Sequence, residues 1–145
     1  MPDAPVLSLE AVNALVPHLN VAIAEQIERR SEIEAKLSLL TEMLGEAPDD
    51  LEPTPSDSEK VAALRLEARE IVAAYRATWN DLEKLGAVVK DPKRGLLDFY
   101  GHVEVQLVWL CWQYGETEVS HYHGLEEGFP GRKAIAHGVK KRLLN

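Results

Sequence analysis

A regular stripe of apolar side chains runs through residues 56–86. Its members recur at alternating steps of three and four: Val61, Leu64, Ala68, Ile71, Tyr75, Thr78, Leu82 and Leu85. This spacing keeps one stripe of a helix facing a partner helix. Ser56 and Glu59 have the spacing of a capping box, and Gly86 follows the last member of the stripe. We therefore expect a long helix between these residues.

A looser apolar stripe precedes it and predicts a first long helix. Its members are Val12, Val16, Leu19, Ile23, Ile27, Ile33, Leu37, Leu40 and Leu44. Ser8 is suited to cap the start of this helix, and Gly45 is suited to end it. Residues 45–55 contain three prolines and four acidic residues, which is typical of an exposed loop. Two long helices joined by such a loop fold back most simply as an antiparallel hairpin over residues 8–86.

The spacing of apolar residues changes from a helical to a strand-like pattern in the C-terminal half of the chain. Short apolar runs occupy residues 87–90, 96–99, 102–113 and 116–123. Tyr100 and Gly101 are expected to break the second run, and Tyr114 and Gly115 to form a turn between the last two. The pattern predicts a small antiparallel sheet over residues 87–130 that includes a β-hairpin.

The register of this hairpin decides which way two histidines point. His121 and His123 lie two residues apart, so both side chains point to the same side of a strand. A two-residue turn at residues 114–115 places them on the face of Trp112, whereas a bulged three-residue loop places them with Cys111. We favour the first register because it gives a continuous apolar face, made by Val108, Leu110, Trp112 and Val119.

These patterns predict an α+β fold, in which a long antiparallel helical hairpin is followed by a small antiparallel β-sheet. The length of 145 residues is that of one domain. We expect a single domain over residues 1–145, with a basic tail over residues 131–145. Helices of about thirty residues are roughly 45 Å long, which exceeds a compact domain of this size. We therefore expect a homo-oligomer, a dimer formed through the hairpin, that covers Leu66, Val72 and Trp79.

Composition and charge exclude several classes of protein. Apolar residues make up 46% of the chain and charged residues 28%, which is a globular composition. No apolar stretch is long enough for a membrane span, and no secretory signal is visible, so we expect a cytoplasmic protein. The net charge of −8 argues against nucleic-acid binding. Cys111 is the single cysteine, which excludes an internal disulfide and fits a reducing compartment.

Several motifs of the C-terminal half resemble an uncharacterised bacterial family, domain of unknown function 2203. The matching segments are residues 94–99 (RGLLDF), 110–112 (LCW), 115–116 (GE), His123 and residues 128–132 (GFPGR). The chain departs from the family pattern where Tyr122, His123 and Gly124 stand in place of Trp-His and an acidic residue. His121 also replaces an aromatic or aliphatic residue. The resemblance implies a helical hairpin with a sheet and supplies no activity.

Polar residues in the sheet region predict a ligand pocket. The candidates are Asp98, Trp112, Glu116, His123 and Arg132. We expect His123 to bond to Asp98 or Glu116, because a carboxylate in an apolar strand must be paired or exposed. Arg132 can hold an anionic ligand, or it can pin its loop to the sheet through an internal carboxylate, for which Asp98 is the best partner.

A metal site is the alternative interpretation of the same region. His121 and His123, with Glu126 and Glu127, can supply three ligands to a divalent transition-metal ion and leave a position open for water or substrate. Cys111 is a candidate nucleophile only if a histidine lies within reach, and a buried structural thiol is the simpler expectation. No catalytic motif is present in the sequence. We therefore predict an oligomeric binding or interaction protein, with a metal-dependent protein, such as a hydrolase, as the alternative.

Overall fold

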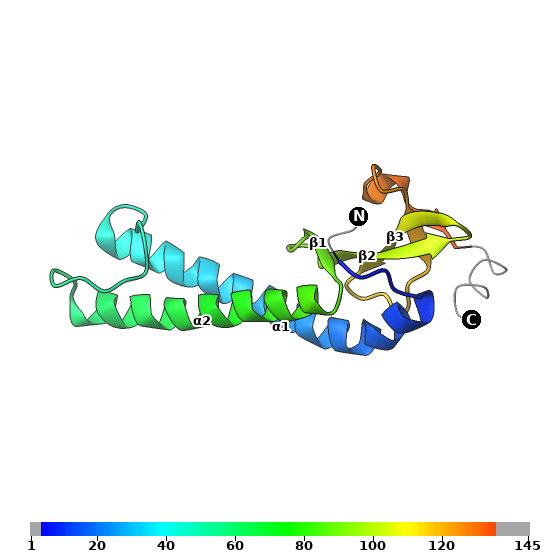
Figure 1. Cartoon of the computed structure of the whole chain (residues 1–145). Helices are drawn as coiled ribbons and strands as arrows, with labels where there is room; N and C mark the ends of the chain where they lie inside the picture. Colours follow the sequence, from blue (N-terminus) through cyan, green and yellow to red (C-terminus); the bar gives the residue numbers. More distant parts are fainter. Residues whose placement is uncertain (1–3, 136–145) are drawn as a thin grey trace. The chain divides into compact units, whose positions relative to one another are not determined.

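The computed structural model describes residues 4–135 (Figure 1). The chain divides into two compact units. Of the described residues, one unit contains 4–24 and 80–135, and the other contains Glu25–Trp79. Helices α1 (Leu9–Leu44) and α2 (Glu59–Lys84) each contribute residues to both units. The prediction of a single domain over the whole chain stays a prediction.

The unit Glu25–Trp79, called the hairpin unit below, is held together by apolar and polar contacts between α1 and α2. Leu40 packs with Val61 and Leu64, which belong to the predicted stripe, and all three side chains are buried. Gln26 is also buried, and its side-chain amide donates a hydrogen bond of 2.8 Å to the carbonyl oxygen of Tyr75. The predicted antiparallel helical hairpin is therefore confirmed, with a polar contact in its centre.

The start of α2 differs from the prediction. The backbone N–H of Val61 donates to Oγ of Ser58 at 3.1 Å, so Ser58 is the N-cap. The capping box predicted at Ser56 and Glu59 is therefore wrong. The physical reason is a turn before the helix, in which the N–H of Thr54 donates to the carboxylate of Asp57 at 2.8 Å. Helix α2 ends at Lys84, one residue before Leu85, the last member of the predicted stripe, and Gly86 then follows with a φ of 109°.

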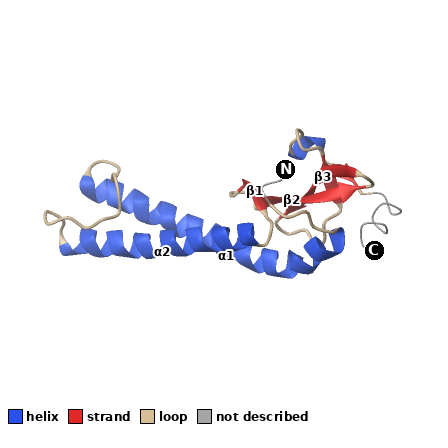
Figure 2. Cartoon of the chain, viewed as in Figure 1, coloured by secondary structure: helices blue, strands red, loops and turns tan. Residues whose placement is uncertain are grey.

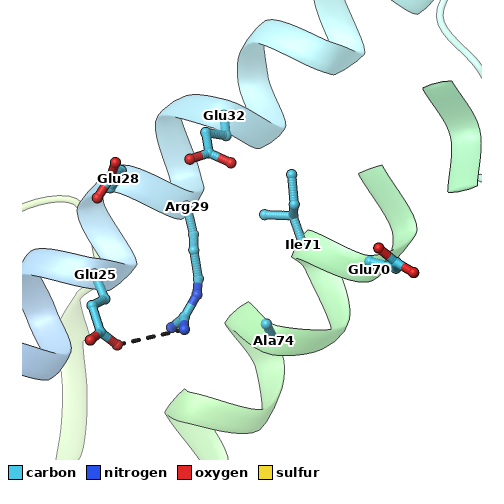
Figure 3. Close-up of a pocket in the computed structure, with 7 residues that line it drawn as sticks. All are labelled: Glu25, Glu28, Arg29, Glu32, Glu70, Ile71 and Ala74. Atoms are coloured by element: carbon cyan, nitrogen blue, oxygen red, sulfur yellow. Dashed lines mark ion pairs between the residues drawn. The ribbon is translucent and has the colours of Figure 1, made fainter. Parts of the chain in front are cut away.

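An acidic hollow of about 370 Å³ lies in the hairpin unit (Figure 3). Glu25, Glu28 and Glu32 line it from α1, and Glu70 lines it from α2. Arg29 also lines it and forms an ion pair of 3.6 Å with Glu25. All four glutamates are exposed, so their charges remain hydrated and need no ligand to balance them.

A five-stranded antiparallel sheet belongs to the other unit (Figure 2). Its strands follow one another in space in the order of the chain: β1 (Val88–Asp91), β2 (Leu96–Val103), β3 (Gln106–Gln113), β4 (His121–His123) and β5 (Lys133–Ala134). A short 3-10 helix, Phe129–Gly131, precedes β5. The α+β fold class is therefore confirmed. Strand β5 lies at the start of the predicted basic tail, and residues 136–145 of that tail lie outside the described residues.

The predicted break at Tyr100 and Gly101 is wrong, because β2 continues through both residues. Gly101 serves packing rather than a turn. A Cβ atom at this position would lie 2.5 Å from Cδ1 of Leu110 on β3. The chain reverses instead between β2 and β3, where Glu104 adopts a φ of 58°. The predicted run over residues 102–113 is therefore divided between two strands.

The favoured register of the histidine strand is also wrong. His121 pairs with Cys111 and His123 pairs with Trp109, so the histidines lie on the face of Cys111 and not on that of Trp112. This is the placement that the alternative register predicted. The returning strand begins only at His121, because residues 114–120 form a longer loop than either register assumed.

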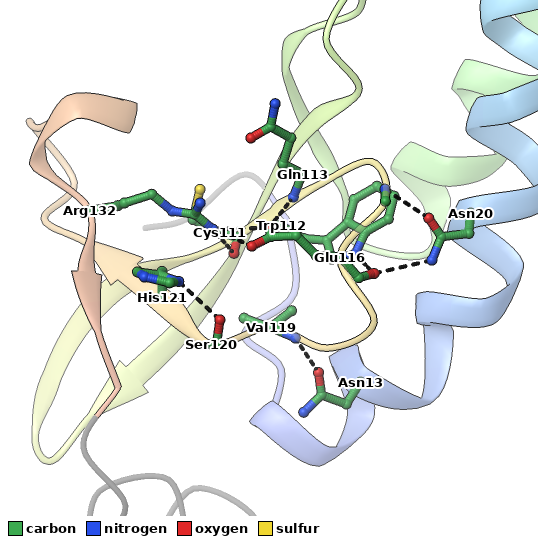
Figure 4. A network of polar contacts seen from close by, with 11 residues as sticks. Asn13, Asn20, Cys111, Trp112, Gln113, Glu116, Val119, Ser120, His121 and Arg132 are labelled. Atoms are coloured by element: carbon green, nitrogen blue, oxygen red, sulfur yellow. Dashed lines mark hydrogen bonds and ion pairs between the residues drawn. The ribbon is translucent and has the colours of Figure 1, made fainter.

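Two asparagines of α1 hold this loop (Figure 4). Asn20 accepts a hydrogen bond from the N–H of Gly115 at 3.1 Å and donates to the carbonyl oxygen of Glu116 at 3.2 Å. Asn13 accepts from the N–H of Val119 at 2.7 Å. The loop is therefore fixed to α1 before the chain enters β4.

The sheet has one apolar face and one mixed face. Leu97, Phe99, Leu110 and Trp112 share one face and are fully buried. The buried residues at the start of α1, Leu9, Val12, Leu19 and Ile23, belong to the same unit and complete its core. The opposite face carries the candidate site. Within residues 4–135, no helix combines the length and the apolar character that crossing a membrane requires.

Candidate metal centre

Three strands bring Asp98, Cys111 and His123 together on the mixed face of the sheet. Asp98 on β2 lies directly opposite Cys111 on β3. His123 on β4 lies opposite the residue two positions before Cys111, so its side chain points to the same face. The three side chains are buried, with exposed fractions of 1%, 0% and 2%. Their candidate ligand atoms all lie within 4.8 Å of one another.

The imidazole of His123 is oriented by the backbone. Its Nδ1 lies 3.0 Å from the carbonyl oxygen of Gly124. A carbonyl can only accept, so Nδ1 carries a proton and donates it. In the neutral ring, Nε2 then presents its lone pair to the other two side chains. This is the arrangement in which a histidine that binds a metal is usually held.

Asp98 is a buried carboxylate with unmet hydrogen-bonding capacity. Its Oδ2 lies 2.9 Å from Nε2 of His123, but neither of its oxygens has a hydrogen bond of good geometry within the described part of the chain. Burial raises the pKa of this carboxyl group, whereas the charge of a protonated His123, the neighbouring thiol of Cys111 and the charge of Lys90 oppose that rise. Because buried charges are normally paired or bound to a metal, the carboxylate of Asp98 needs either a protonated His123 or a metal ion beside it.

Burial also acts on Cys111. It raises the pKa of the thiol from 9.0 to about 12, and the neighbouring carboxylate of Asp98 adds to this rise. The metal-free protein therefore holds Cys111 as a neutral thiol. A thiol is a poor nucleophile compared with a thiolate, so the geometry favours the predicted buried thiol over a catalytic cysteine.

Arg132 and Glu116 form a partly buried ion pair next to this group (Figure 4). Nη2 of Arg132 donates to the two carboxylate oxygens of Glu116 at 3.0 and 3.1 Å. It also contacts the carbonyl oxygen of Cys111 at 3.4 Å. The expected pinning of the loop by Arg132 is thus present, but Asp98 was the wrong partner. Asp98 lies beside His123 instead.

The predicted pocket residues do not all come together. Trp112 points to the opposite face of the sheet from Asp98 and His123, because it alternates with Cys111 along β3. Its side chain is fully buried, and its indole N–H donates to the carbonyl oxygen of Glu116 at 3.1 Å. Trp112 therefore belongs to the core rather than to the candidate site.

The predicted metal ligands separate in the structure. His123 belongs to the buried group, whereas the candidate ligand atoms of the other three residues lie outside it. Nδ1 of His121 contacts Oγ of Ser120 at 2.9 Å. Glu127 accepts from the N–H of Gly124 and lies 3.7 Å from Nζ of Lys133, while Glu126 is exposed. Cys111 is absent from the predicted ligands, although it occupies the strand next to that of Asp98.

Comparison with protein-family models identifies the family of this chain. A model described as an uncharacterized conserved protein, DUF2203, matches residues 6–135. The chain belongs to the DUF2203 family. Searches of the curated proteins and of the solved structures found no match. The match to DUF2203 covers both helices and all five strands, so the candidate centre lies within the matched region.

Proposed function

We propose that this DUF2203 protein binds a Zn²⁺ ion through Asp98, Cys111 and His123. The observation that supports the proposal is the buried carboxylate of Asp98, which lacks a hydrogen-bond partner of good geometry in residues 4–135 and lies next to a thiol and an imidazole nitrogen. An oxygen, a sulfur and a nitrogen ligand together suit Zn²⁺, which accepts all three.

Charge balance favours a divalent ion at this position. The thiolate of Cys111 and the carboxylate of Asp98 contribute two negative charges, and a neutral His123 adds none. A buried centre with a divalent cation is then neutral overall, which avoids the cost of an unpaired buried charge. Binding replaces the proton of the Cys111 thiol, because the thiolate is the form that binds metal.

The ligand distances are close to those of a tetrahedral site. Zinc bonds of about 2.0–2.1 Å to nitrogen and oxygen and about 2.3 Å to sulfur imply separations of roughly 3.3 Å between N and O and 3.6 Å between N and S. Nε2 of His123 and Oδ2 of Asp98 lie 2.9 Å apart, and the thiol sulfur of Cys111 lies within 4.8 Å of both ligands. The N–O separation is thus slightly shorter than a zinc site requires, and the required N–S separation falls within the range that the sulfur occupies.

Metal analysis of the untagged protein tests the proposal. We expect one zinc ion per chain, and we expect competition with a chromophoric chelator to give a measurable affinity. Cys111→Ser and His123→Ala should each weaken binding by at least about tenfold, since even partners of ligands are worth 10–100-fold. His102→Ala is the matched control, because His102 is exposed and lies outside the buried group.

Two results would overturn the proposal. One is a wild-type protein that takes up no zinc in the titration. The other is an affinity that Cys111→Ser and His123→Ala leave at the level of His102→Ala. Circular dichroism of each variant shows whether a loss of binding reflects the ligand or a loss of fold.

Homodimerisation remains a second proposal, for which exposed apolar side chains of the hairpin unit are the support. Leu66 is 44% exposed, and Ile27, Leu39 and Met43 are 36–40% exposed. Val72 and Trp79, the other residues expected to be covered, are half-buried. We expect light scattering after size exclusion to give twice the chain mass at micromolar concentration, and Leu66→Glu to give the monomer. A wild-type monomer at that concentration contradicts the proposal.

We also propose a cytoplasmic location and no nucleic-acid partner, on the same grounds of cysteine use and net charge. The net charge of −8 disfavours contact with phosphate backbones. A reducing compartment keeps the single Cys111 available as a thiol. Fractionation of cells that make the protein tests the location, and a filter-binding assay with duplex DNA tests the second expectation.

A further inference from the structure

His121 stands next to the buried group on the same face of the sheet. It is the direct cross-strand partner of Cys111, which itself lies opposite Asp98. Directly opposed residues of antiparallel strands have Cβ atoms about 4.5–5.5 Å apart. An imidazole and a thiolate at such positions can reach the same ion. Unlike the three buried side chains, that of His121 is half-buried.

The two histidines of β4 are held in the same way. Nδ1 of His121 contacts Oγ of Ser120 at 2.9 Å, and Nδ1 of His123 contacts the carbonyl oxygen of Gly124 at 3.0 Å (Figure 4 shows the first contact). Each ring is thus tied through Nδ1 to a neighbour in the chain. The carbonyl contact leaves Nε2 of His123 as the nitrogen that can bind a metal, and Nε2 of His121 is free in the same way when the hydroxyl of Ser120 accepts from Nδ1.

We infer that His121 is the fourth ligand of the ion, which rests on the proposed zinc site. Zinc in a closed protein site takes four ligands, and the buried group supplies three. The nitrogens of His121 lie outside that group, so binding requires a rotation of its side chain in which the contact with Ser120 is given up or remade. That rotation brings Nε2 towards the ion from the side of β4, opposite to Asp98 on β2.

This assignment defines the class of the centre. Asp98, Cys111, His121 and His123 complete a tetrahedral site that leaves no position for water. A closed site of this kind stabilises structure, whereas a hydrolytic zinc site keeps an open position. The ion then joins β2, β3 and β4, and it fixes the three-residue β4 to the longer strands.

Cobalt substitution tests the fourth ligand. Tetrahedral Co²⁺ with a thiolate ligand gives strong visible absorption and a sulfur-to-metal charge-transfer band. We expect both in the wild-type protein. His121→Ala should weaken the visible bands, keep the charge-transfer band from Cys111, and reduce zinc affinity by at least about tenfold. His121→Gln provides a second variant of similar size, and His102→Ala is the control.

The outcomes separate this inference from the proposal beneath it. If the wild-type protein binds no metal, the zinc site itself fails and the inference fails with it. If the wild-type protein and both His121 variants bind zinc with equal affinity and give the same cobalt spectrum, the zinc site stands and His121 is not a ligand. A loss of zinc affinity in both His121 variants that His102→Ala does not show supports the assignment.

Discussion

Nε2 of His123 lies 2.9 Å from Oδ2 of Asp98, and both side chains are almost completely buried. Nδ1 of the same ring faces the carbonyl oxygen of Gly124, so it carries a proton. A neutral ring then directs a lone pair at a carboxylate. The contact is stable only if a proton or a metal cation lies between the two side chains.

Asp98→Asn should separate the roles of this residue in folding and in metal binding. The raised pKa of Asp98 means that the folded state holds the carboxyl proton more tightly than the unfolded state. Its contribution to stability is thus greatest at low pH and is lost as the pH rises through its folded pKa, so the carboxylate is unfavourable at pH 7. We expect the variant to lose zinc binding and to unfold, in the presence of chelator, at or above the wild-type melting temperature. A clear drop in that temperature would show that Asp98 has a structural role instead.

The thiol of Cys111 should be unreactive in the folded, metal-free protein. Its pKa of about 12 and its complete burial keep it neutral and shielded at pH 8. We expect slow modification by iodoacetamide in buffer with chelator and rapid modification in denaturant. Fast modification of the native protein at pH 8 would contradict the described environment.

The raised pKa of the Cys111 thiol predicts that the stability of the folded protein decreases at alkaline pH. The thiol pKa is about 12 in the folded protein, against an ordinary value of 9.0. The folded state therefore retains the proton where the unfolded state loses it, so this contribution is complete below pH 9 and is lost as the pH approaches 12. Denaturant unfolding with chelator at pH 8 and pH 10 measures the loss. Cys111→Ala serves as the reference, and its free energy of unfolding should fall less between pH 8 and pH 10.

The pair of Arg132 and Glu116 should contribute to stability independently of any metal. Both side chains are partly buried, and Arg132 also contacts the carbonyl oxygen of Cys111. We expect Arg132→Met to lower the free energy of unfolding by about 1–3 kcal/mol, because it leaves Glu116 without its charged partner. Urea unfolding in chelator measures this change. Glu126→Gln, at an exposed position, should stay within about 0.5 kcal/mol of the wild type.

Two serines near the start of α2 offer a matched pair. Ser58 accepts a hydrogen bond from the N–H of Val61, whereas Oγ of Ser56 contacts the hydroxyl group of Thr54 before the helix begins. We expect Ser58→Ala to cost about 1 kcal/mol of stability and Ser56→Ala to cost clearly less. A larger loss of stability for Ser56→Ala than for Ser58→Ala in urea unfolding would show that Ser56 is the N-cap.

The sequence was sufficient to predict the helical hairpin, because the apolar pattern that indicates it is long and depends only on residues close together in the chain. The stripe from Val61 to Leu85 repeats over several turns, and its members Leu64 and Ala68 are buried as expected, whereas Leu85 lies beyond the helix and is exposed. The exact start of α2 was missed because Ser56 and Ser58 are both good capping residues. The turn that decides between them depends on Asp57, whose side chain bonds to Thr54.

The site was harder to predict because it depends on register across three strands. A shift of one residue moves His123 from one face of the sheet to the other. The loop that sets the register is held by Asn13 and Asn20, which lie about a hundred positions earlier in the chain and have no local signal there. Two clues were available in the strands themselves. Asp98 interrupts an apolar run, Cys111 is the single cysteine of the chain, and the two prove to be direct neighbours.

The position of Trp109 gives the protein a built-in optical reporter. This indole lies directly across from His123, stacks on the ring of Tyr100, and has Nζ of Lys90 at 4.1 Å from its ring centre. Energy transfer falls steeply with distance, so a coloured ion at the centre would quench the emission of such a close fluorophore. Loading with cobalt can therefore be followed in real time by intrinsic fluorescence, without any attached dye.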